Sequence, residues 1–168
     1  MEFTDRISRV QQQWNVQRPD LDVAPQGIIG RLHRLANYLT SELVSVYEKH
    51  GLSEGEFDVL ATLRRSGEPF AMAPSELAAH TVVTTGAMTK RLDRLVASGL
   101  VSREPVEVDQ RRRRVSLTET GLQTIDAAFT EHMANEKRLI AHLSQSDQEL
   151  LQKLLHNWLT QYENPGRE

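Results

Sequence analysis

The sequence predicts a mainly α-helical protein with one small β-hairpin, and three observations support this fold class. Apolar residues recur at helical spacing through most of the 168 residues. Glycines stand where three of these helical patterns end, at Gly51, Gly67 and Gly99. One region, around residues 100–118, has β-prone residues on both sides of a charged tip, which is the pattern of a hairpin.

The N-terminal part of the chain is expected to form two helices. The first has an apolar face made of Phe3, Ile7, Val10 and Trp14. Pro19 lies beyond its end, and the polar loop that follows includes Pro25. A broad apolar stripe from Ile28 to Tyr47 then predicts a long second helix, which ends at Gly51.

Two shorter helices are expected next. Ser53, with Glu56 three residues later, forms the capping-box pattern that opens a third helix. This helix ends near Gly67, and Pro74 then stands in the first turn of a short helix over residues 74–79.

A fifth helix is expected to begin near Thr84 and to end at Gly99. Its inward face consists of Met88, Leu92, Leu95 and Val96. The hairpin strands are expected over residues 100–106 and 113–118, with the charged residues between them at the tip. The pattern is helical again from Gly121, and Ser146 is expected to cap a final helix.

This order of elements describes a winged helix-turn-helix with N- and C-terminal dimerisation helices. Residues 1–18 form an extra N-terminal helix, residues 53–120 the winged helix-turn-helix lobe, and residues 19–52 and 121–164 a helical dimerisation region. The flanking helices carry more apolar surface than a small domain needs, so we expect them to pack against a second copy. The alternative is that they close the core of a monomer.

The composition and the absence of known motifs exclude several classes of protein and several kinds of binding site. There is no cysteine, which excludes disulfides and thiolate metal sites and fits a cytoplasmic location. We find no signal peptide and no run of about 18 apolar residues, so no contact with a membrane is expected. No Walker loop, Rossmann glycines or G-x-S-x-G motif is present, so neither an enzyme nor a cofactor is expected. A helical zinc site remains an alternative role for the six scattered histidines: His33, His50, His80, His132, His142 and His156.

Positive charge is concentrated in one segment of an acidic chain. The whole chain has a formal net charge of −3. Residues 84–114 contain eight basic and four acidic residues, a net of +4, which leaves −7 for the rest. The basic residues are Lys90, Arg91, Arg94, Arg103 and Arg111 to Arg114. Such a basic island suits a polyanionic partner, and a merely solvated charged loop is the alternative.

The helix that begins near Thr84 has the character of a DNA recognition helix. Threonine and lysine near its N-terminus can reach base edges and phosphates in the major groove. The residues expected there are Thr84, Thr85, Thr89, Lys90 and Arg94. Arg111 on the wing would reach the adjacent minor groove, where negative potential attracts arginine, and Arg112 beside it is also expected to bind DNA. Asp109 is expected to hold an arginine in place, with Arg94 as one candidate.

Several motifs in this region resemble the MarR family of bacterial transcriptional regulators. They are MTKRLDRL at residues 88–95, GLV at 99–101, the D-x-R of Asp109 and Arg111, and V-x-L-T-x-x-G at 115–121. The resemblance implies a homodimer that binds a pseudo-palindromic double-stranded DNA operator, usually to repress a neighbouring gene. It also implies release by a small anionic or aromatic ligand, and a minor-groove contact by Arg111.

A finer resemblance is to the urate-responsive branch of that family, which has an extra N-terminal helix with a tryptophan. Its W/F-D-x-L-x-x-L-x-R pattern matches FDVLATLRR at residues 57–65, and an arginine precedes the wing. The ligand-binding residues implied here are Trp14, Asp58, Arg65 and Arg103. Arginine offers a planar fork to a planar anion, and tryptophan offers a stacking surface. This sequence departs from the pattern by a second arginine, Arg64, beside Arg65.

Other interpretations of the same residues stay open at this point. In the first alternative, Trp14 is a core residue. In the others, Asp58 and Arg65 lie on a solvated helix face, and Arg103 contacts a DNA phosphate. Within the family, a phenolic carboxylate such as salicylate is the alternative ligand. A non-specific architectural DNA-binding protein is the alternative function, and it would bind random duplexes nearly as well as its best site.

Overall fold

The computed structural model describes residues 5–81, 85–106 and 109–163. The chain divides into two compact units, Met1–Glu54 and Gly55–Glu168. Among the described residues, we find no helix that combines the length and hydropathy needed to cross a lipid bilayer.

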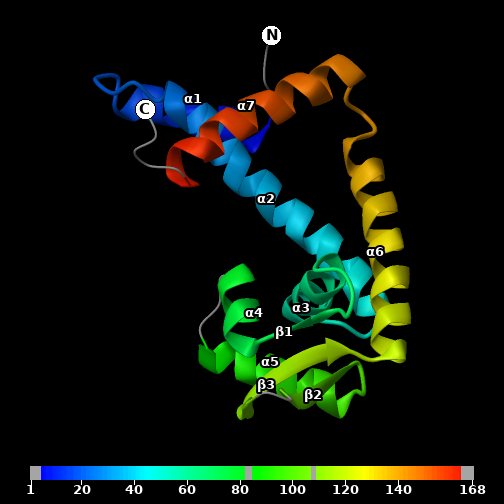
Figure 1. The fold of residues 1–168 in the computed structure, drawn as a ribbon. Coiled ribbons are helices and arrows are strands. Elements are labelled where there is room, and N and C mark those ends of the chain that lie inside the picture. Colours follow the sequence, from blue (N-terminus) through cyan, green and yellow to red (C-terminus); the bar gives the residue numbers. More distant parts are fainter. Residues whose placement is uncertain (1–4, 82–84, 107–108, 164–168) are drawn as a thin grey trace. The chain divides into compact units, whose positions relative to one another are not determined.

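The first unit consists of helix α1 (Arg6–Gln17) and the long helix α2 (Ala24–Lys49), with α1 beside the N-terminal part of α2 (Figure 1). The Asp5 side chain caps α1 by accepting a hydrogen bond from the Ser8 amide at 2.9 Å. Pro25 lies in the first turn of α2, so its expected place in the preceding loop was wrong. Proline is tolerated there because the first turn has no intrahelical partner for its missing N–H.

Polar contacts fasten α1 to α2. The Arg31 guanidinium donates to Asp5 Oδ2 at 2.7 Å, to Ser8 Oγ at 2.9 Å and to the Gly27 carbonyl at 2.8 Å. The hydrogen bond from Arg31 lowers the pKa of Asp5 to about 2. A Cβ on Gly30 would lie 3.0 Å from Ile7 Cδ1, so glycine permits the close approach of the two helices.

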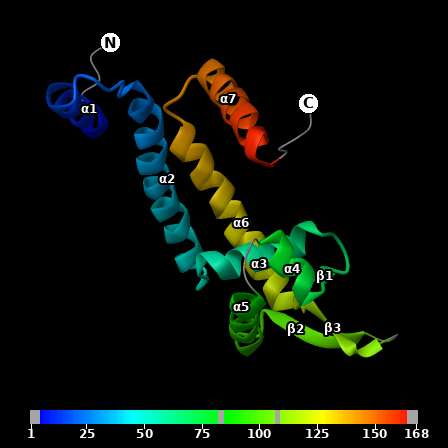
Figure 2. The ribbon, with the colours of Figure 1, turned by 90° about the vertical axis from the view of Figure 1, so that its left-hand side faces the viewer.

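The second unit contains three helices and a small sheet, followed by two long helices. The first group is α3 (Glu54–Arg65), α4 (Pro74–His80) and α5 (Thr85–Ala97). The strands are β1 (Ala71–Met72), β2 (Val101–Val106) and β3 (Asp109–Leu117), and the last helices are α6 (Glu119–Ile140) and α7 (Gln145–Glu163). Figure 2 shows β2 and β3 projecting from the same end of this unit as α5.

The sheet is antiparallel with the strand order β1-β3-β2. Two features differ from the expected hairpin. The pair Ala71–Met72 adds a third strand, and β3 begins at Asp109, so the backbone of Arg111 and Arg112 belongs to a strand and not to a tip. The strand was missed because two residues are too short to show an alternating pattern.

One apolar core joins α3, α4, α5, the sheet and the start of α6. The largest fully buried side chains include Leu60, Leu63, Leu77, Met88, Leu92, Leu95, Val115 and Ile125. Val96 was expected on the inward face of α5 but is 39% exposed. Its position is one residue beyond Leu95 and therefore about 100° around the helix from the buried stripe.

Helices α6 and α7 begin at well-defined caps. Thr118 Oγ1 accepts a hydrogen bond from the Gly121 amide at 2.9 Å and donates to the Gly99 carbonyl at 2.7 Å. Helix α7 begins after Ser144, whose Oγ accepts from the Asp147 amide at 3.2 Å. The expected cap at Ser146 was therefore two residues too late.

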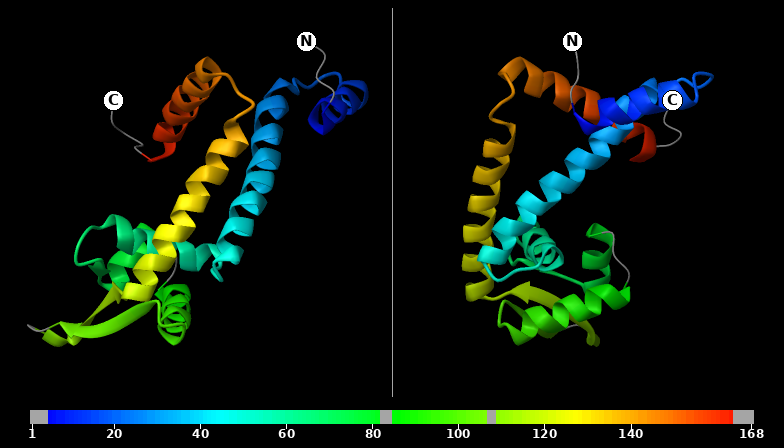
Figure 3. Two further views of the ribbon diagram at one scale, coloured as in Figure 1. Left: turned by 90° about the vertical axis from the view of Figure 1, so that its right-hand side faces the viewer. Right: turned by 180° about the vertical axis from the view of Figure 1, so that it is seen from behind.

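Helix α6 leads away from the sheet and α7 follows at its far end (Figure 3). No residue of α7 is buried within the chain. Its exposed apolar side chains are Leu150, Leu151, Leu154, Leu155, Leu159 and Tyr162.

Candidate nucleic-acid interface and ligand site

Helix α5 presents a polar face on the side opposite its core residues. Thr89 and Lys90 are exposed, whereas Met88, Leu92 and Leu95 are buried. Thr85 is the first residue of the helix. Thr84 lies outside the described residues, as does the Thr85 side chain. The face therefore has the polar N-terminal half that a recognition helix needs.

Among the described residues, ion pairs connect α5 to α3 and to β2. Arg94 Nε lies 3.2 Å from Glu56 Oε1 on α3. Arg103 on β2 lies 2.8 Å from Asp93 Oδ1 on α5. The described partner of Arg94 is thus Glu56, a residue that sequence reasoning assigned only to a helix cap. Nothing in the sequence distinguished it from the other glutamates near the start of α3.

The two long strands bring acidic and basic residues into register. Glu104 pairs with Arg114, Pro105 with Arg113, and Val106 with Asp109, with an irregularity between Pro105 and Val106. The Arg114 side chain donates to the Ala71 carbonyl at 3.2 Å and so links β3 to β1. The side chains of Asp109, Arg111 and Arg112 lie outside the described part of the chain, so their expected roles stay predictions.

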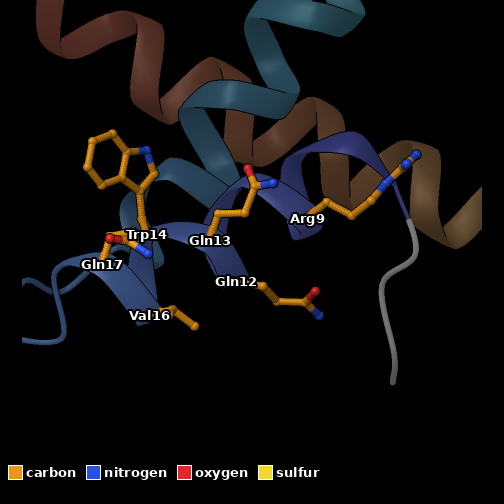
Figure 4. A pocket seen from close by; sticks show the side chains of 6 residues that line it. All are labelled: Arg9, Gln12, Gln13, Trp14, Val16 and Gln17. Atoms are coloured by element: carbon orange, nitrogen blue, oxygen red, sulfur yellow. The ribbon is translucent and has the colours of Figure 1, made fainter.

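The four residues expected to bind a ligand are distributed over both units. Trp14 is on α1 in the first unit and is 48% exposed, so its side chain is not core within this chain. Figure 4 shows its indole ring beside a hollow of about 760 Å³. The lining residues are Arg9, Gln12, Gln13, Trp14, Val16 and Gln17.

Asp58, Arg65 and Arg103 are in the second unit. Arg65 is exposed at the end of α3 and lines a cavity of about 330 Å³ between α3 and α6. The other lining residues are Ala61, Arg64, Ile125, Asp126 and Phe129. Asp58 is half-buried on α3. Arg103 is held by Asp93, and no described contact joins Arg103 to Arg65.

The two neighbouring arginines have different surroundings. Arg64 Nε donates to Asp126 Oδ1 at 2.7 Å, which raises the pKa of Arg64, and its Cζ lies 4.9 Å from the centre of the Phe70 ring. Arg65 has no such described partner. Sequence reasoning missed Asp126 and Phe129 because both look like ordinary residues of an amphipathic helix.

The described residues contain no group of three or more histidine, cysteine, aspartate or glutamate side chains that is suited to a metal ion. His132 instead lies 3.2 Å from Glu136 Oε1, and its ring centre is 5.2 Å from that of Phe57. These contacts give His132 a structural role on α6.

Comparisons with known proteins agree on one family. A sequence profile of the MarR family matches residues 50–112. The chain is 39% identical to the HTH-type transcriptional regulator PecS of Dickeya dadantii, over 89% of this chain and 90% of PecS. AbsC, a MarR family transcriptional regulator from Streptomyces coelicolor, superposes with a TM-score of 0.72 at 27% identity, over 85% of this chain and 97% of AbsC. A mutant MarR from E. coli complexed with operator DNA superposes with a TM-score of 0.68 at 27% identity, over 83% of this chain and 99% of MarR. The winged helix-turn-helix expected from the sequence is confirmed.

Proposed function

This chain belongs to the MarR family of DNA-binding transcriptional regulators, and on that premise we propose that it binds a pseudo-palindromic operator as a homodimer and is released by urate. The family assignment confirms that the chain is a regulator and not an enzyme. The observation that carries the proposal for DNA is the exposed polar face of α5 with Thr89 and Lys90, at the same end of the unit as β2 and β3.

The dimer follows from the apolar residues that one chain leaves exposed. Helix α7 has no buried residue and exposes five leucines. A single soluble chain rarely exposes so continuous an apolar helix face, so a second copy is the occupant we propose. Two recognition helices related by a two-fold axis would then meet half-sites about 34 Å apart, one turn of DNA.

On the DNA, we propose that Thr84, Thr85, Thr89 and Lys90 reach the major groove, that Arg111 reaches the minor groove, and that Arg112 also binds DNA. Arg111→Ala is expected to weaken operator binding and to reduce the log–log salt slope by about 0.9 for each phosphate that a subunit no longer neutralises. Titrations of a labelled operator at several salt concentrations measure both quantities. Unchanged affinity at all salt concentrations would contradict a wing contact by Arg111. A random duplex serves as the control, because an architectural protein would bind it nearly as well.

The proposal for urate rests on the cationic and apolar character of the cavity beside Arg65. Arg65 offers a guanidinium without a described internal partner, while Ile125 and Phe129 supply apolar surface. A volume of about 330 Å³ lies within the range of small-molecule sites. Arg103 is outside the lining of this cavity, and its described partner is Asp93 on α5. An anion that attracted Arg103 would compete with Asp93 on the recognition helix.

Thermal unfolding with and without urate tests this site. We expect urate to raise the melting temperature of the wild-type protein by a few degrees, because a ligand that binds the native state stabilises it. Arg65→Ala should abolish this shift while operator binding persists. Arg138→Ala removes an arginine of α6 outside the cavity lining and serves as the charge-matched control.

The ligand controls separate the alternatives. Salicylate would use the same arginines. A rise in melting temperature with salicylate but not with urate would therefore identify a phenolic carboxylate as the ligand. A shift that survives Arg65→Ala would show that the ligand binds elsewhere. A neutral purine tests whether the negative charge is required.

A further inference from the structure

Arg94 and Glu56 form a contact that joins the end of the recognition helix to the start of the preceding long helix. Arg94 is in the last turn of α5, and Glu56 is in the first turn of α3. A cation at a helix C-terminus and an anion at a helix N-terminus are each favoured by the helix dipole. Each charge of the pair therefore stabilises the end of the helix on which it lies, and the distance from Arg94 Nε to Glu56 Oε1 is 3.2 Å.

A second arginine of α5 contacts the same turn of α3. A Cβ on Gly55 would lie 2.5 Å from Arg91 Cζ, so the Arg91 guanidinium sits directly on the backbone of α3. Arg91 and Arg94 are three residues apart and share one side of α5. Lys90, four residues before Arg94, is also its neighbour on the helix surface, but it lies about 100° from Arg91, on the far side of Arg94, and is exposed. The side of α5 with Arg91 and Arg94 is therefore directed at α3.

The side chains of Arg94 and Glu56 differ in their exposure to solvent. The Arg94 side chain is 64% exposed, whereas that of Glu56 is only 14% exposed. If Arg94 moved to a DNA phosphate, a largely buried carboxylate would lose this cation, and withdrawing one partner from such a carboxylate is costly. Although the Arg94 side chain is mostly exposed, its pairing with the largely buried Glu56 carboxylate keeps it on α3.

From these contacts we propose that Arg94 is a positioning residue for the recognition helix and does not contact DNA. Together with Arg91 it fixes the angle of α5 on α3, while the Asp93–Arg103 pair holds the helix to β2. The reading of base edges then belongs to the N-terminal half of α5, with Thr89 and Lys90. This reverses the role that the basic island suggested for Arg94.

Glu56→Gln separates the two roles by the sign of its effect. If Arg94 contacted DNA, removing the competing carboxylate would release Arg94 and tighten operator binding. If Arg94 positions α5, the same change weakens operator binding by up to about fivefold, which is the effect expected for the loss of a partly exposed ion pair. The operator is a duplex selected by the wild-type protein from a random-sequence pool. Tighter or unchanged binding by Glu56→Gln overturns the proposal.

Arg94→Met supplies an independent measurement. A positioning role predicts weaker operator binding with an unchanged salt slope, because no phosphate contact is removed, and unchanged binding to a random duplex. Lys90→Met is the matched control, and its slope is expected to fall by about 0.9 per phosphate contact. A similar fall for Arg94→Met overturns the proposal.

The double variant Glu56→Gln/Arg94→Met completes a double-mutant cycle of operator affinities. A positioning pair predicts that it binds the operator no more weakly than either single variant, since both changes remove the same contact. Additive losses would show that the residues act separately and would overturn the proposal. Far-UV circular dichroism of each variant verifies that the helices remain folded. None of these readouts depends on urate, so the proposal for the ligand can fail without affecting them.

Discussion

Gly121→Ala is expected to destabilise the second unit by about 3 kcal/mol, because the new methyl group would be forced into a well-packed backbone contact. A Cβ at this position would overlap the Leu100 carbonyl oxygen, and backbone atoms there have little room to move. Leu100 is held in place because its carbonyl accepts a hydrogen bond from the Thr118 amide at 3.2 Å. The contact therefore joins the start of α6 to the start of β2, at the base of the wing.

Thermal and urea unfolding measure this effect directly. Gly86→Ala is the matched control, since a Cβ on Gly86 would meet no atom within 4 Å. Alanine is favoured over glycine inside a helix by roughly 1 kcal/mol, so the control should be neutral or slightly stabilising. A Gly121→Ala protein as stable as the wild type would show that the approach of Leu100 to α6 is not close in solution.

Leu151→Glu/Leu155→Glu is expected to separate the homodimer and to reduce operator affinity by roughly a hundredfold or more, since an operator of two half-sites needs two joined recognition helices. Both leucines are about two-fifths exposed and lie one helical turn apart on α7. Placing two carboxylates at this apolar face would leave charges buried in an interface without partners.

Analytical ultracentrifugation and operator titrations test this pair of changes together. Lys153→Glu is the control, because it changes the net charge by the same amount and lies on a different side of α7. A double variant that stays dimeric would place the interface elsewhere. A monomer with wild-type operator affinity would contradict the need for a dimer.

The sequence predicted those elements whose apolar pattern lasts several turns, and it missed details set by single contacts. The stripes of α2, α5 and α6 indicated the correct helices because apolar residues that recur every three to four positions line one face of a helix. The start of α7 was placed at Ser146, although Ser144 provides the cap, because serine occurs at both positions and periodicity cannot choose between them. The short strand β1 depends on pairing with β3, a contact between distant parts of the sequence.

For the candidate DNA-binding and ligand-binding residues, the sequence predicted the charge of a segment but not the partners of single side chains. The basic character of α5 and β3 is evident in the local sequence, and the exposure of Lys90 agrees with it. The partners of Arg94, Arg103 and Arg64 were not predictable, because Glu56, Asp93 and Asp126 meet them only through tertiary packing. Among many carboxylates in a charged chain, the pattern alone cannot select the one that reaches a given arginine.

Asp5 has two tasks at once, and this has a practical consequence for handling the protein. The same carboxylate caps α1 and binds Arg31, so removal of the first five residues would take away both the cap and the anchor of the helix. A single proteolytic cut near the N-terminus would thereby weaken the packing of α1, with Trp14, on α2, while the contacts of Ser8 with Arg31 and of Ile7 with Gly30 would remain. An affinity tag is better joined at the C-terminus, and intact mass should be verified before any ligand titration.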